Sequence, residues 1–570
     1  MPARQRLAAF LVTVVALGSA AALTWAAAQP VPAYPAAAAA PRFDADRALA
    51  EAVTLATDYP DRVVGSETSA RARAWLLGRF AELGLPTASL PFTATVASQA
   101  RGGVQVWATS PGASDEIILV SAHYDVPQTG IPGAADDASG IGTVLELARV
   151  FAGEPHQRTF IFMASDSEEY GAFWGAKNFS EQFPQKNKIV AVLDLDYLSA
   201  RDLKRINLSS AGLHRGYTPL WLRQVGLAAI EAAGAEANEA DGLLEYLYRA
   251  IPIGAADYSM YLRAGLAAVN FGGEPTDPQN WLAEYHTPLD TPEKLRAPAF
   301  ALYGRAAEIW LRTVDALDPL PANVSDYFRL NRSRYVPGWA MQLAQALVFV
   351  PLALTFGMAW STQKPRADEM RPEFLAWLAL VVIGLDGYAT AFSLVSLGYL
   401  PRYEMFPANP NDPFLLQPTW WAVAVIAGVM LLFGWYTFRV GGWGFYAGLL
   451  DIPFRRTTLL GLLAVLSAVV WLLNGFTATA LLGPAALLWP WIEPGERLLK
   501  KLLNLALALA GAAPFAAFVA FFAANFPIGP WWWYLTLGAA YGLFPPLAVG
   551  LFLGALALML RFMAHGLKDS

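Results

Sequence analysis

Three short apolar runs that end in acidic or imidazole side chains decide the fold: ILVSAHYDV at 118–126, TFIFMASDSEEYG at 159–171 and IVAVLDLD at 189–196. Each run is nearly continuous, which is typical of strands buried on both faces of a parallel sheet. A helical stretch from Ala138 to Phe151 separates the first two. We therefore predict an α/β domain with a mixed, mostly parallel central sheet flanked by helices.

The chain before these runs is expected to supply further parts of the same domain. Helical spacing of apolar residues predicts one helix over 43–59 and a second that starts at the N-cap Ser66 and ends at Gly84. The alternation in LPFTATVAS (90–98) and GGVQVWATS (102–110) then predicts an antiparallel pair of strands.

The chain after the runs is expected to close the domain. Segment 201–250 is mixed in character and predicts a helical excursion near the mouth of the site, and 263–273 predicts a late strand. The stretch 291–317 predicts a closing amphipathic helix, with Asp290 or Thr291 as its N-cap and a proline next to it.

Composition divides the chain of 570 residues, which is too long for one domain and is 55% hydrophobic. Residues 42–318 have the composition of a soluble domain, and 319–338 is assigned as a linker. From 339 to 570 we predict an all-α polytopic transmembrane domain with about seven spans. The apolar runs that indicate these spans are 339–360, 374–400, 419–438, 457–475, 477–492, 502–525 and 531–560.

The N-terminus carries a targeting element. The basic start MPARQR precedes an apolar run at 7–28, which is either an uncleaved signal anchor or a signal peptide cleaved near TWAAAQP. Residues 1–29 are assigned to this element, and 30–41 to a Pro/Ala linker without a core-forming pattern. In both interpretations, the domain that follows is exported from the cytoplasm.

Basic residues in the loops agree with one membrane orientation. With a cytoplasmic N-terminus and a spanning run at 7–28, nearly all loop Lys and Arg lie on the cytoplasmic side. These residues are Lys364, Arg366, Arg371, Arg439, Arg455, Arg456, Arg497, Lys500, Lys501, Arg561 and Lys568. We expect an integral multi-pass protein of about eight spans. Its domain at 42–318 would be extracytoplasmic, on the periplasmic side of a bacterial inner membrane or in an organelle lumen.

Residue counts limit the possible ligands. The chain has no cysteine, so disulfides and thiolate metal sites are excluded, and a zinc site must use His, Asp and Glu. Only five histidines are available as imidazole ligands. No basic patch interleaved with aromatic residues indicates nucleic acid, and the net charge of -6 identifies no partner.

The polar residues after the first run have both a metal-binding and a structural interpretation. His123 ends the run, and Asp125 is placed to accept a hydrogen bond from the imidazole N–H that faces away from a metal. A buried core histidine is the structural alternative. Asp136 and Asp137 lie in a Gly/Ala-rich turn that opens a helix, where one of them can simply cap the helix.

The later runs end in carboxylates. Glu168 and Glu169 follow the second run, where a turn can direct both side chains into one cleft, so that one binds metal while the other takes a proton from water. Two solvated glutamates are the alternative. Asp194 and Asp196 share one face of the third run, and carboxylates in so apolar a strand need partners or a cation. His286, in a later loop, has little to mark it alone.

These candidate residues share a position in the predicted sheet. His123, Asp136, the Glu168–Glu169 pair and Asp196 all fall at or just beyond the C-terminal ends of predicted strands, where open parallel sheets form ligand sites. Five His, Asp and Glu ligands with one shared carboxylate suit two zinc ions about 3.5–4 Å apart.

The blocks SAHYDV, GAADDASG, SDSEEYGAFWGAKNF, LDLDYLS and EYHTPLDTPEKL, in this order, resemble the co-catalytic dizinc exopeptidase family. Bacterial leucyl aminopeptidases, glutamate carboxypeptidase II and glutaminyl cyclases are members. The resemblance covers about residues 42–318. A soluble domain followed by many spans resembles the membrane-tethered subgroup, the endoplasmic reticulum metallopeptidase and vacuolar membrane protease type.

This resemblance implies a zinc aminopeptidase-like fold and hydrolysis of peptide bonds by an exopeptidase, of the aminopeptidase type, with two Zn²⁺ per chain. Glu168 would be the general base, Tyr285 would stabilise the oxyanion, and Asp125 would orient an imidazole ligand. Asp136 would bridge the two ions, and the full set of metal ligands would be His123, Asp136, Glu169, Asp196 and His286.

The sequence departs from the family in two places. Asp194 stands where many relatives have Asn, which adds a negative charge near the metals. The neighbours of Asp257 are not the usual ones, which leaves the specificity pocket open. A glutaminyl-cyclase-like acyltransferase with one zinc is the alternative enzyme. A non-catalytic receptor ectodomain and a transport role for the spans are the others. Asp386, inside an apolar run, is the candidate for transport, although a single acid satisfied by a neighbouring helix explains it as well.

Overall fold

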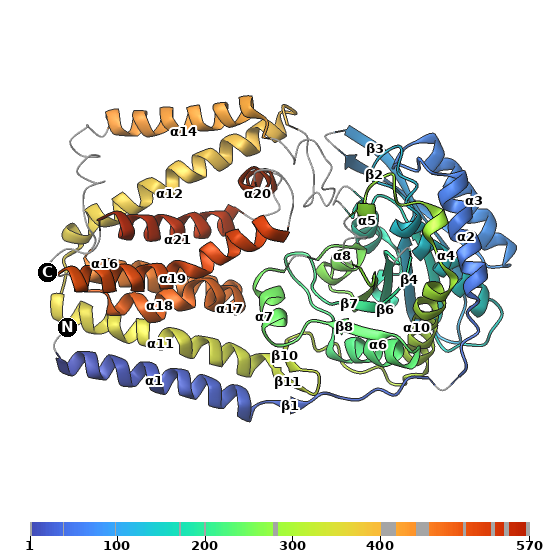
Figure 1. The fold of residues 1–570 in the computed structure, drawn as a ribbon, viewed down its shortest axis with the longest axis horizontal. Helices are drawn as coiled ribbons and strands as arrows, with labels where there is room; N and C mark the ends of the chain where they lie inside the picture. Colours follow the sequence, from blue (N-terminus) through green and yellow to red (C-terminus); the bar gives the residue numbers. More distant parts are fainter. Residues whose placement is uncertain are drawn as a thin grey trace.

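The computed structural model describes residues 3–37, 39–96, 99–169, 173–198, 201–252, 254–277, 283–400, 418–440, 455–493, 497–525, 531–540 and 546–565. Figure 1 shows a sheet flanked by helices on one side of the molecule and a body of long helices on the other. Helix α1 (Ala3–Ala26) lies in the helical body, beside α11 (Gly338–Gln363). The chain therefore leaves the helical body after α1, forms the sheet body, and returns at α11.

The sheet has eight strands in the order β2-β3-β5-β4-β6-β9-β7-β8. The neighbours β4/β5, β4/β6, β6/β9 and β7/β8 are parallel, and β2/β3, β3/β5 and β7/β9 are antiparallel, so the predicted mixed, mostly parallel sheet is confirmed. The strands are β2 (Thr87–Val96), β3 (Gln99–Ser110), β4 (Ile117–His123), β5 (Thr159–Ser165), β6 (Ile189–Asp196), β7 (Arg205–Ser209), β8 (Glu236–Glu239) and β9 (Ala268–Glu274).

Helices cover both faces of the sheet because successive strand residues point to opposite sides. Ile118 and Val120 of β4 face one cluster, which also holds residues of α2 (Ala45–Asp58), α3 (Glu67–Glu82), α4 (Ser139–Phe151), α6 (Leu220–Ala232) and α10 (Ala297–Ala316). Ile117 and Leu119 face a second cluster with α5 (Trp174–Gln182) and α8 (Asp257–Arg263). The strand core is thus buried on both faces, as the continuous apolar runs predicted.

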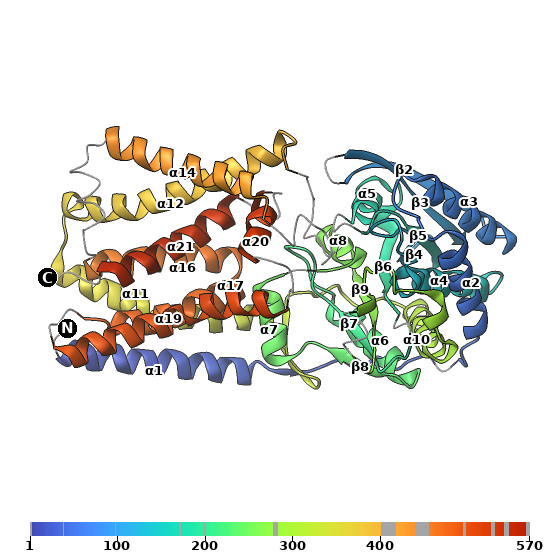
Figure 2. The ribbon, with the colours of Figure 1, turned by 45° about the horizontal axis from the view of Figure 1, so that its top comes forward.

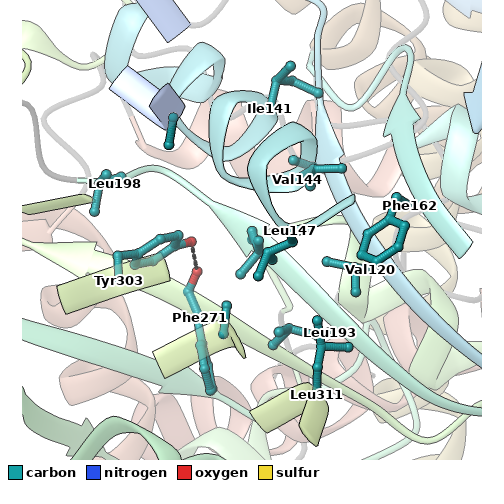
Figure 3. Packing of buried hydrophobic residues seen from close by; sticks show 14 of the residues in the cluster. Val120, Ile141, Val144, Leu147, Phe162, Leu193, Leu198, Phe271, Tyr303 and Leu311 are labelled. Atoms are coloured by element: carbon teal, nitrogen blue, oxygen red, sulfur yellow. Dashed lines mark hydrogen bonds between the residues drawn. The ribbon is translucent and has the colours of Figure 1, made fainter. Parts of the chain in front are cut away.

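Figure 3 shows the first cluster from close by, with Val120 and Phe162 of the sheet against Val144 and Leu147 of α4. Burying each such side chain completely contributes about 1.5–3 kcal/mol. The hydroxyl of Tyr303, in α10, donates a hydrogen bond of 2.5 Å to the carbonyl of Phe271 in β9. These contacts fix the strand ends that carry the polar residues.

Most predicted elements of the sheet body are confirmed, and the start of the closing helix is corrected. Ser66 caps α3 by accepting from Ser69 N at 3.0 Å, as predicted. The closing helix begins only at Ala297, after a 3₁₀ turn at Pro292–Lys294, so Asp290 and Thr291 do not cap it. The carboxylate of Asp290 instead accepts backbone N–H groups of the turn after β4.

Segment 201–250 also differs from the prediction. It contains two helices, α6 and α7 (Gly242–Ala250), but also β7 and β8, which extend the sheet beyond β9. Residues assigned to the two linkers also take part in strands. Residues Gln29–Pro30 form β1, which pairs with β11 (Arg334–Pro337), and β11 pairs with β10 (Tyr327–Asn331). A small sheet therefore joins the two crossings between the bodies.

In the helical body, six helices of the described chain are long and apolar enough to cross a membrane: Arg4–Ala26, Gly338–Gln363, Ala367–Ser396, Arg456–Leu473, Leu498–Ala517 and Pro546–Met563. A shorter apolar stretch, Trp420–Tyr436, belongs to α14 (Trp420–Val440). In the run at 531–560 the structure describes α20 (Trp531–Ala540) and α21 (Pro546–His565), and residues 541–545 lie outside the described residues. The run at 477–492 consists of short pieces ending with α18 (Gly483–Leu488) and a 3₁₀ turn.

The remaining helices are α12 (Ala367–Ser396), α16 (Arg456–Leu473), α17 (Gly475–Thr477) and α19 (Leu498–Asn525). In both orientations of the molecule, most of them run side by side across the helical body (Figures 1 and 2). Several loops on which the predicted orientation depends, including 401–417 and 441–454, lie outside the described residues.

Candidate metal centre

His123 and Asp136 form the centre of the site, at the C-terminal end of β4. Nε2 of His123 lies 3.0 Å from Oδ1 of Asp136. The other oxygen of Asp136, Oδ2, lies 3.0 Å from Nε2 of His286. One buried carboxylate therefore stands between two imidazoles and directs one oxygen to each. This is the arrangement expected of a carboxylate shared by two neighbouring cation positions.

The turn that carries Asp136 has an unusual backbone conformation. It starts at Gly133, which has a φ of +58°, and a Cβ there would lie 2.6 Å from the carbonyl oxygen of Asp136. A cis peptide bond joins Asp136 to Asp137. Asp137 Oδ1 accepts the N–H of Gly140 at 2.8 Å in the first turn of α4, so Asp137 is the member of the pair that caps the helix.

Glu168 and Glu169 lie in the turn directly after β5, where Ser167 has a φ of 60°. Oε2 of Glu169 lies 3.1 Å from Nε2 of His286, and Oε2 of Glu168 lies 4.0 Å from Nε2 of His123. Both carboxylates thus face the same buried space, which is what the turn at the strand end was predicted to allow.

Asp125 holds this turn in place. Its Oδ1 accepts the backbone N–H of Glu168 at 3.1 Å, and its Oδ2 accepts that of Glu169 at 3.2 Å. Oδ1 is also 3.6 Å from Nδ1 of His123, slightly beyond hydrogen-bonding distance. The predicted role of Asp125, support for His123, is therefore the smaller part of its observed contacts.

Asp196 and Asp194 come from the end of β6. Oδ1 of Asp196 lies 3.6 Å from Nε2 of His123, so Asp196 reaches the centre. Asp194 has other partners: its Oδ1 accepts from the Ser121 hydroxyl at 2.7 Å, and its Oδ2 accepts from Tyr258 N at 3.0 Å. Burial, together with the charge of Asp196, raises the pKa of Asp194 to about 7.

Tyr285 and His286 approach the centre from a loop before α10. His286 has a φ of 56°, and its ring is stacked on that of Tyr285 with centroids 3.7 Å apart. The Tyr285 ring also contacts that of Tyr197 edge-to-face at 5.9 Å. Burial raises the pKa of Tyr285 well above its usual value, so its hydroxyl stays protonated and can donate a hydrogen bond.

Two residues that the sequence analysis did not identify as site residues hold the backbone around the centre. Arg62 is fully buried and donates to the carbonyl oxygens of Tyr124, Pro132 and Gly133 at 2.5–2.6 Å. Asp290 accepts from the N–H groups of Ala135 and Asp136 at 2.8 and 3.1 Å. Neither role is visible as a spacing pattern in the sequence, because the partners are backbone groups far away in the chain.

Burial changes the proton affinity of these groups. It raises the pKa of Glu168 well above its usual value, and it raises the pKa of Glu169 to about 7. Burial by itself lowers the pKa of His286, but the negative charges of Glu169 and Asp136 and their hydrogen bonds to the ring together outweigh it and raise that pKa to about 10. Without a cation, the cluster therefore retains protons near neutral pH, and a bound metal would displace them.

The donor set fits a zinc site, because imidazole nitrogens and carboxylate oxygens are ligands that Zn²⁺ accepts. Within 4.8 Å of one another lie ligand atoms of two groups, His123 with Asp136 and Glu169, and His123 with Asp137 and Asp196. Oε1 of Glu169 and Oδ2 of Asp137 are buried and find no hydrogen-bond donor among the described residues. Such carboxylate oxygens are costly to bury without a cation.

A family model matches the part of the chain that carries these residues. Residues 105–311 match the sequence model of the family described as Peptidase family M28, and this part of the chain is a peptidase family M28 domain.

Individual relatives share shorter segments. The chain is 28% identical over 199 residues, 32% of its length, to "Aminopeptidase YwaD" of Bacillus subtilis, covering 37% of that protein. It is 39% identical over 79 residues, 14% of its length, to a "Vacuolar membrane protease" of Schizosaccharomyces pombe, covering 9% of that protein. The chain thus spans well under half of these relatives.

Among solved structures, a zinc aminopeptidase from Bacillus subtilis superimposes with a TM-score of 0.40 and 14% identity, covering 49% of this chain and 97% of that one.

Proposed function

We propose that the protein is a membrane-bound zinc metallopeptidase that hydrolyses peptide bonds as an exopeptidase, of the aminopeptidase type. The observation that carries this proposal is Asp136, whose two oxygens face two imidazoles within a ring of buried carboxylates. The peptidase domain comprises residues 42–318, and residues 339–570 form the membrane domain. The match to Peptidase family M28 supports the reaction class.

Two Zn²⁺ ions would be held by the five residues that the geometry brings together. Asp136 would be shared, Glu169 and His286 would lie on one side of it, and His123 and Asp196 on the other. Asp137 is a further carboxylate in reach, although its Oδ1 is already engaged by Gly140. Bound zinc supplies Lewis acidity that polarises the scissile carbonyl and lowers the pKa of a water molecule.

The residues of the chain would then act on the substrate as follows. The Glu168 carboxylate accepts a proton from the attacking water and returns it to the leaving amine. Asp125 keeps Glu168 in place through its backbone N–H. The Tyr285 hydroxyl donates to the oxyanion that develops at the carbonyl oxygen. The low exposure of the cluster excludes competing water and strengthens each of these interactions.

Membrane attachment is part of this proposal. The packing of α1 along α11, and an ion pair of 2.6 Å between Arg6 and Glu493, support an anchor that remains in the protein. With the N-terminus in the cytoplasm, the peptidase domain would be extracytoplasmic.

The test combines metal content with an unmodified peptide panel, with and without a chelator. Two zinc ions per chain and chelator-sensitive release of N-terminal residues would support the proposal. One zinc with cyclisation of N-terminal glutamine would favour an acyltransferase instead. Absence of both metal and turnover in the folded protein would leave a binding ectodomain.

A further inference from the structure

Helix α7 is fixed to the sheet body through a buried ionic network on one of its faces. Glu245, whose side chain is fully buried, accepts from Arg223 Nη1 at 3.0 Å and from Arg249 Nε at 2.8 Å, and its carboxylate also accepts from the Tyr217 hydroxyl. The guanidinium of Arg249 lies 3.7 Å from the centre of the Tyr217 ring. Because these partners are buried and bound to one another, the rotation of α7 about its own axis is set.

The opposite face of α7 is apolar and uncovered. Leu243 is 76% exposed, and Leu244, Leu247 and Tyr248 are 40–46% exposed. Positions 243, 244, 247 and 248 fall on one side of a helix. A helix that keeps its charged residues buried and turns its leucines outward differs from an ordinary surface helix of a soluble domain, which does the reverse.

The position of α7 explains this inversion. Asn474, which directly follows α16, donates from Nδ2 to the carbonyl of Arg249 at 2.8 Å, and Thr477 donates from Oγ1 to that of Ala250 at 2.6 Å. The C-terminal end of α7 is therefore joined to the sheet-side end of a candidate span. Figures 1 and 2 both show α7 between the sheet and the ends of the long helices.

A second set of contacts places α7 beside the sheet-side ends of the candidate spans. The Tyr246 ring packs against Phe328 and Phe476, with centroids 5.9 and 5.0 Å apart. The same apolar cluster includes residues at the sheet-side ends of two other candidate spans, namely Ala27 and Ala28 after α1 and Ala340 and Met341 in the first turn of α11. Helix α7 thus lies beside the sheet-side ends of three candidate spans, α1, α11 and α16.

Apolar side chains at the span ends near α7 are also exposed. Leu472 and Leu473, the last residues of α16, are 75% and 59% exposed and immediately precede Asn474. Trp25 and Trp339, at the sheet-side ends of α1 and α11, are exposed as well. Exposed tryptophans at span ends mark the headgroup layer of a bilayer.

We propose that α7 is an interfacial helix whose Leu243, Leu244, Leu247 and Tyr248 lie in the headgroup and acyl-chain boundary of the lipid bilayer. Interfacial helices bury their apolar face about 5–10 Å into this boundary. Here the helix is already ordered by the Glu245 network, so lipid contact requires no folding step. It gives the peptidase domain a further attachment to the membrane besides its two chain connections. The proposal rests on the membrane placement of the spans and not on metal binding or peptidase activity.

The chain has no cysteine, so single reporter sites can be introduced directly. Leu243→Cys and Leu247→Cys, each in the full-length chain, would be labelled with a nitrobenzoxadiazole probe and reconstituted into phosphatidylcholine–phosphatidylglycerol vesicles. Glu82→Cys is the matched control, since Glu82 is the exposed last residue of α3 on the sheet body. Quenching by doxyl-labelled lipid and by aqueous iodide is compared at each site.

We expect doxyl lipid to quench the probes at 243 and 247 at least about twofold more strongly than at 82, and iodide to quench them correspondingly less. Equal iodide quenching at all three sites would show α7 in water and overturn the proposal. Probes at 243 and 247 that neither quencher reaches would also overturn it, because a second protein copy would then cover the helix. Two independent labelling sites and an unchanged elution volume guard against a misfolded variant. No outcome depends on enzymatic turnover.

Discussion

Asp125→Asn is the substitution that tests the construction of the metal centre most directly. Both oxygens of Asp125 accept backbone N–H groups, from Glu168 at 3.1 Å and from Glu169 at 3.2 Å, and the side chain is buried. The same carboxylate lies beside His123. One side chain thus supports the proposed base and two proposed zinc ligands, so we predict losses in stability, metal affinity and turnover together.

The size of the effect follows from these bonds. Asparagine keeps one acceptor oxygen, but its amide group faces the other backbone N–H as a second donor. One bond to a charged acceptor is lost and the other becomes neutral, which costs roughly 2–4 kcal/mol. For a domain of this size, Tm would fall by about 5–15 °C. Loss of such support for ligands lowers zinc affinity by about 10–100-fold, and a displaced Glu168 lowers kcat by at least about tenfold at saturating zinc.

The assay is a zinc titration against a competing chelator, followed by thermal unfolding and peptide hydrolysis of the zinc-saturated protein. Asp115→Asn is the matched control, because Asp115 is exposed and pairs only at the surface with Lys188. It is expected to behave as the wild type. Wild-type zinc affinity and Tm in Asp125→Asn would refute the role assigned to this carboxylate.

Three further predictions concern the same centre. Glu168→Ala keeps its metal, measured by elemental analysis, but loses about 10²–10⁴-fold in turnover, and retention of more than about a tenth would contradict the assignment of the base. Tyr285→Phe keeps the ring stack on His286 and lowers kcat by about 10²–10³-fold without loss of zinc; an unchanged kcat would remove the hydroxyl from the mechanism. The chelated protein becomes less stable as pH rises from about 4.5 to 10, because the folded-state pKa values of Glu169, about 7, and His286, about 10, are raised, so that the unfolded chain binds fewer protons over this range. Thermal unfolding at pH 5, 7 and 9 checks this, and a Tm of the chelated protein that rises with pH would contradict it.

The central strands and the polar residues at their ends were predictable because the signals are local. A buried strand is a continuous apolar run, and His123 and Asp196 are the last residues of β4 and β6. The turn that brings Glu168 and Glu169 into one space could be anticipated only as a possibility. Its cause, the carboxylate of Asp125, lies 43 and 44 residues earlier in the chain.

What the sequence did not reveal depends on partners distant in the chain. The sequence pattern predicts that Asp290 caps a helix, yet its carboxylate accepts N–H groups 154 and 155 residues away. The closing helix therefore starts later than predicted. Strands β7 and β8 were read as part of a helical excursion, because short strands near a sheet edge carry little periodicity. The ionic network of α7 was not recognisable either, since Glu245 and Arg249 have the spacing of an ordinary exposed ion pair.

Helix α8 connects the proposed metal centre with the helical body. The N–H of its second residue, Tyr258, holds Asp194, two residues before the proposed ligand Asp196. The side chains of Tyr258 and Met260 belong to the apolar cluster that also contains Leu400 after α12 and Trp533 of α20. An apolar surface shared in this way would be exposed to water if the peptidase domain were separated from the spans, and burial of such surface is what positions α8. The helical body therefore packs against the helix that holds Asp194, and the proposed activity is best measured on the full chain reconstituted into a bilayer.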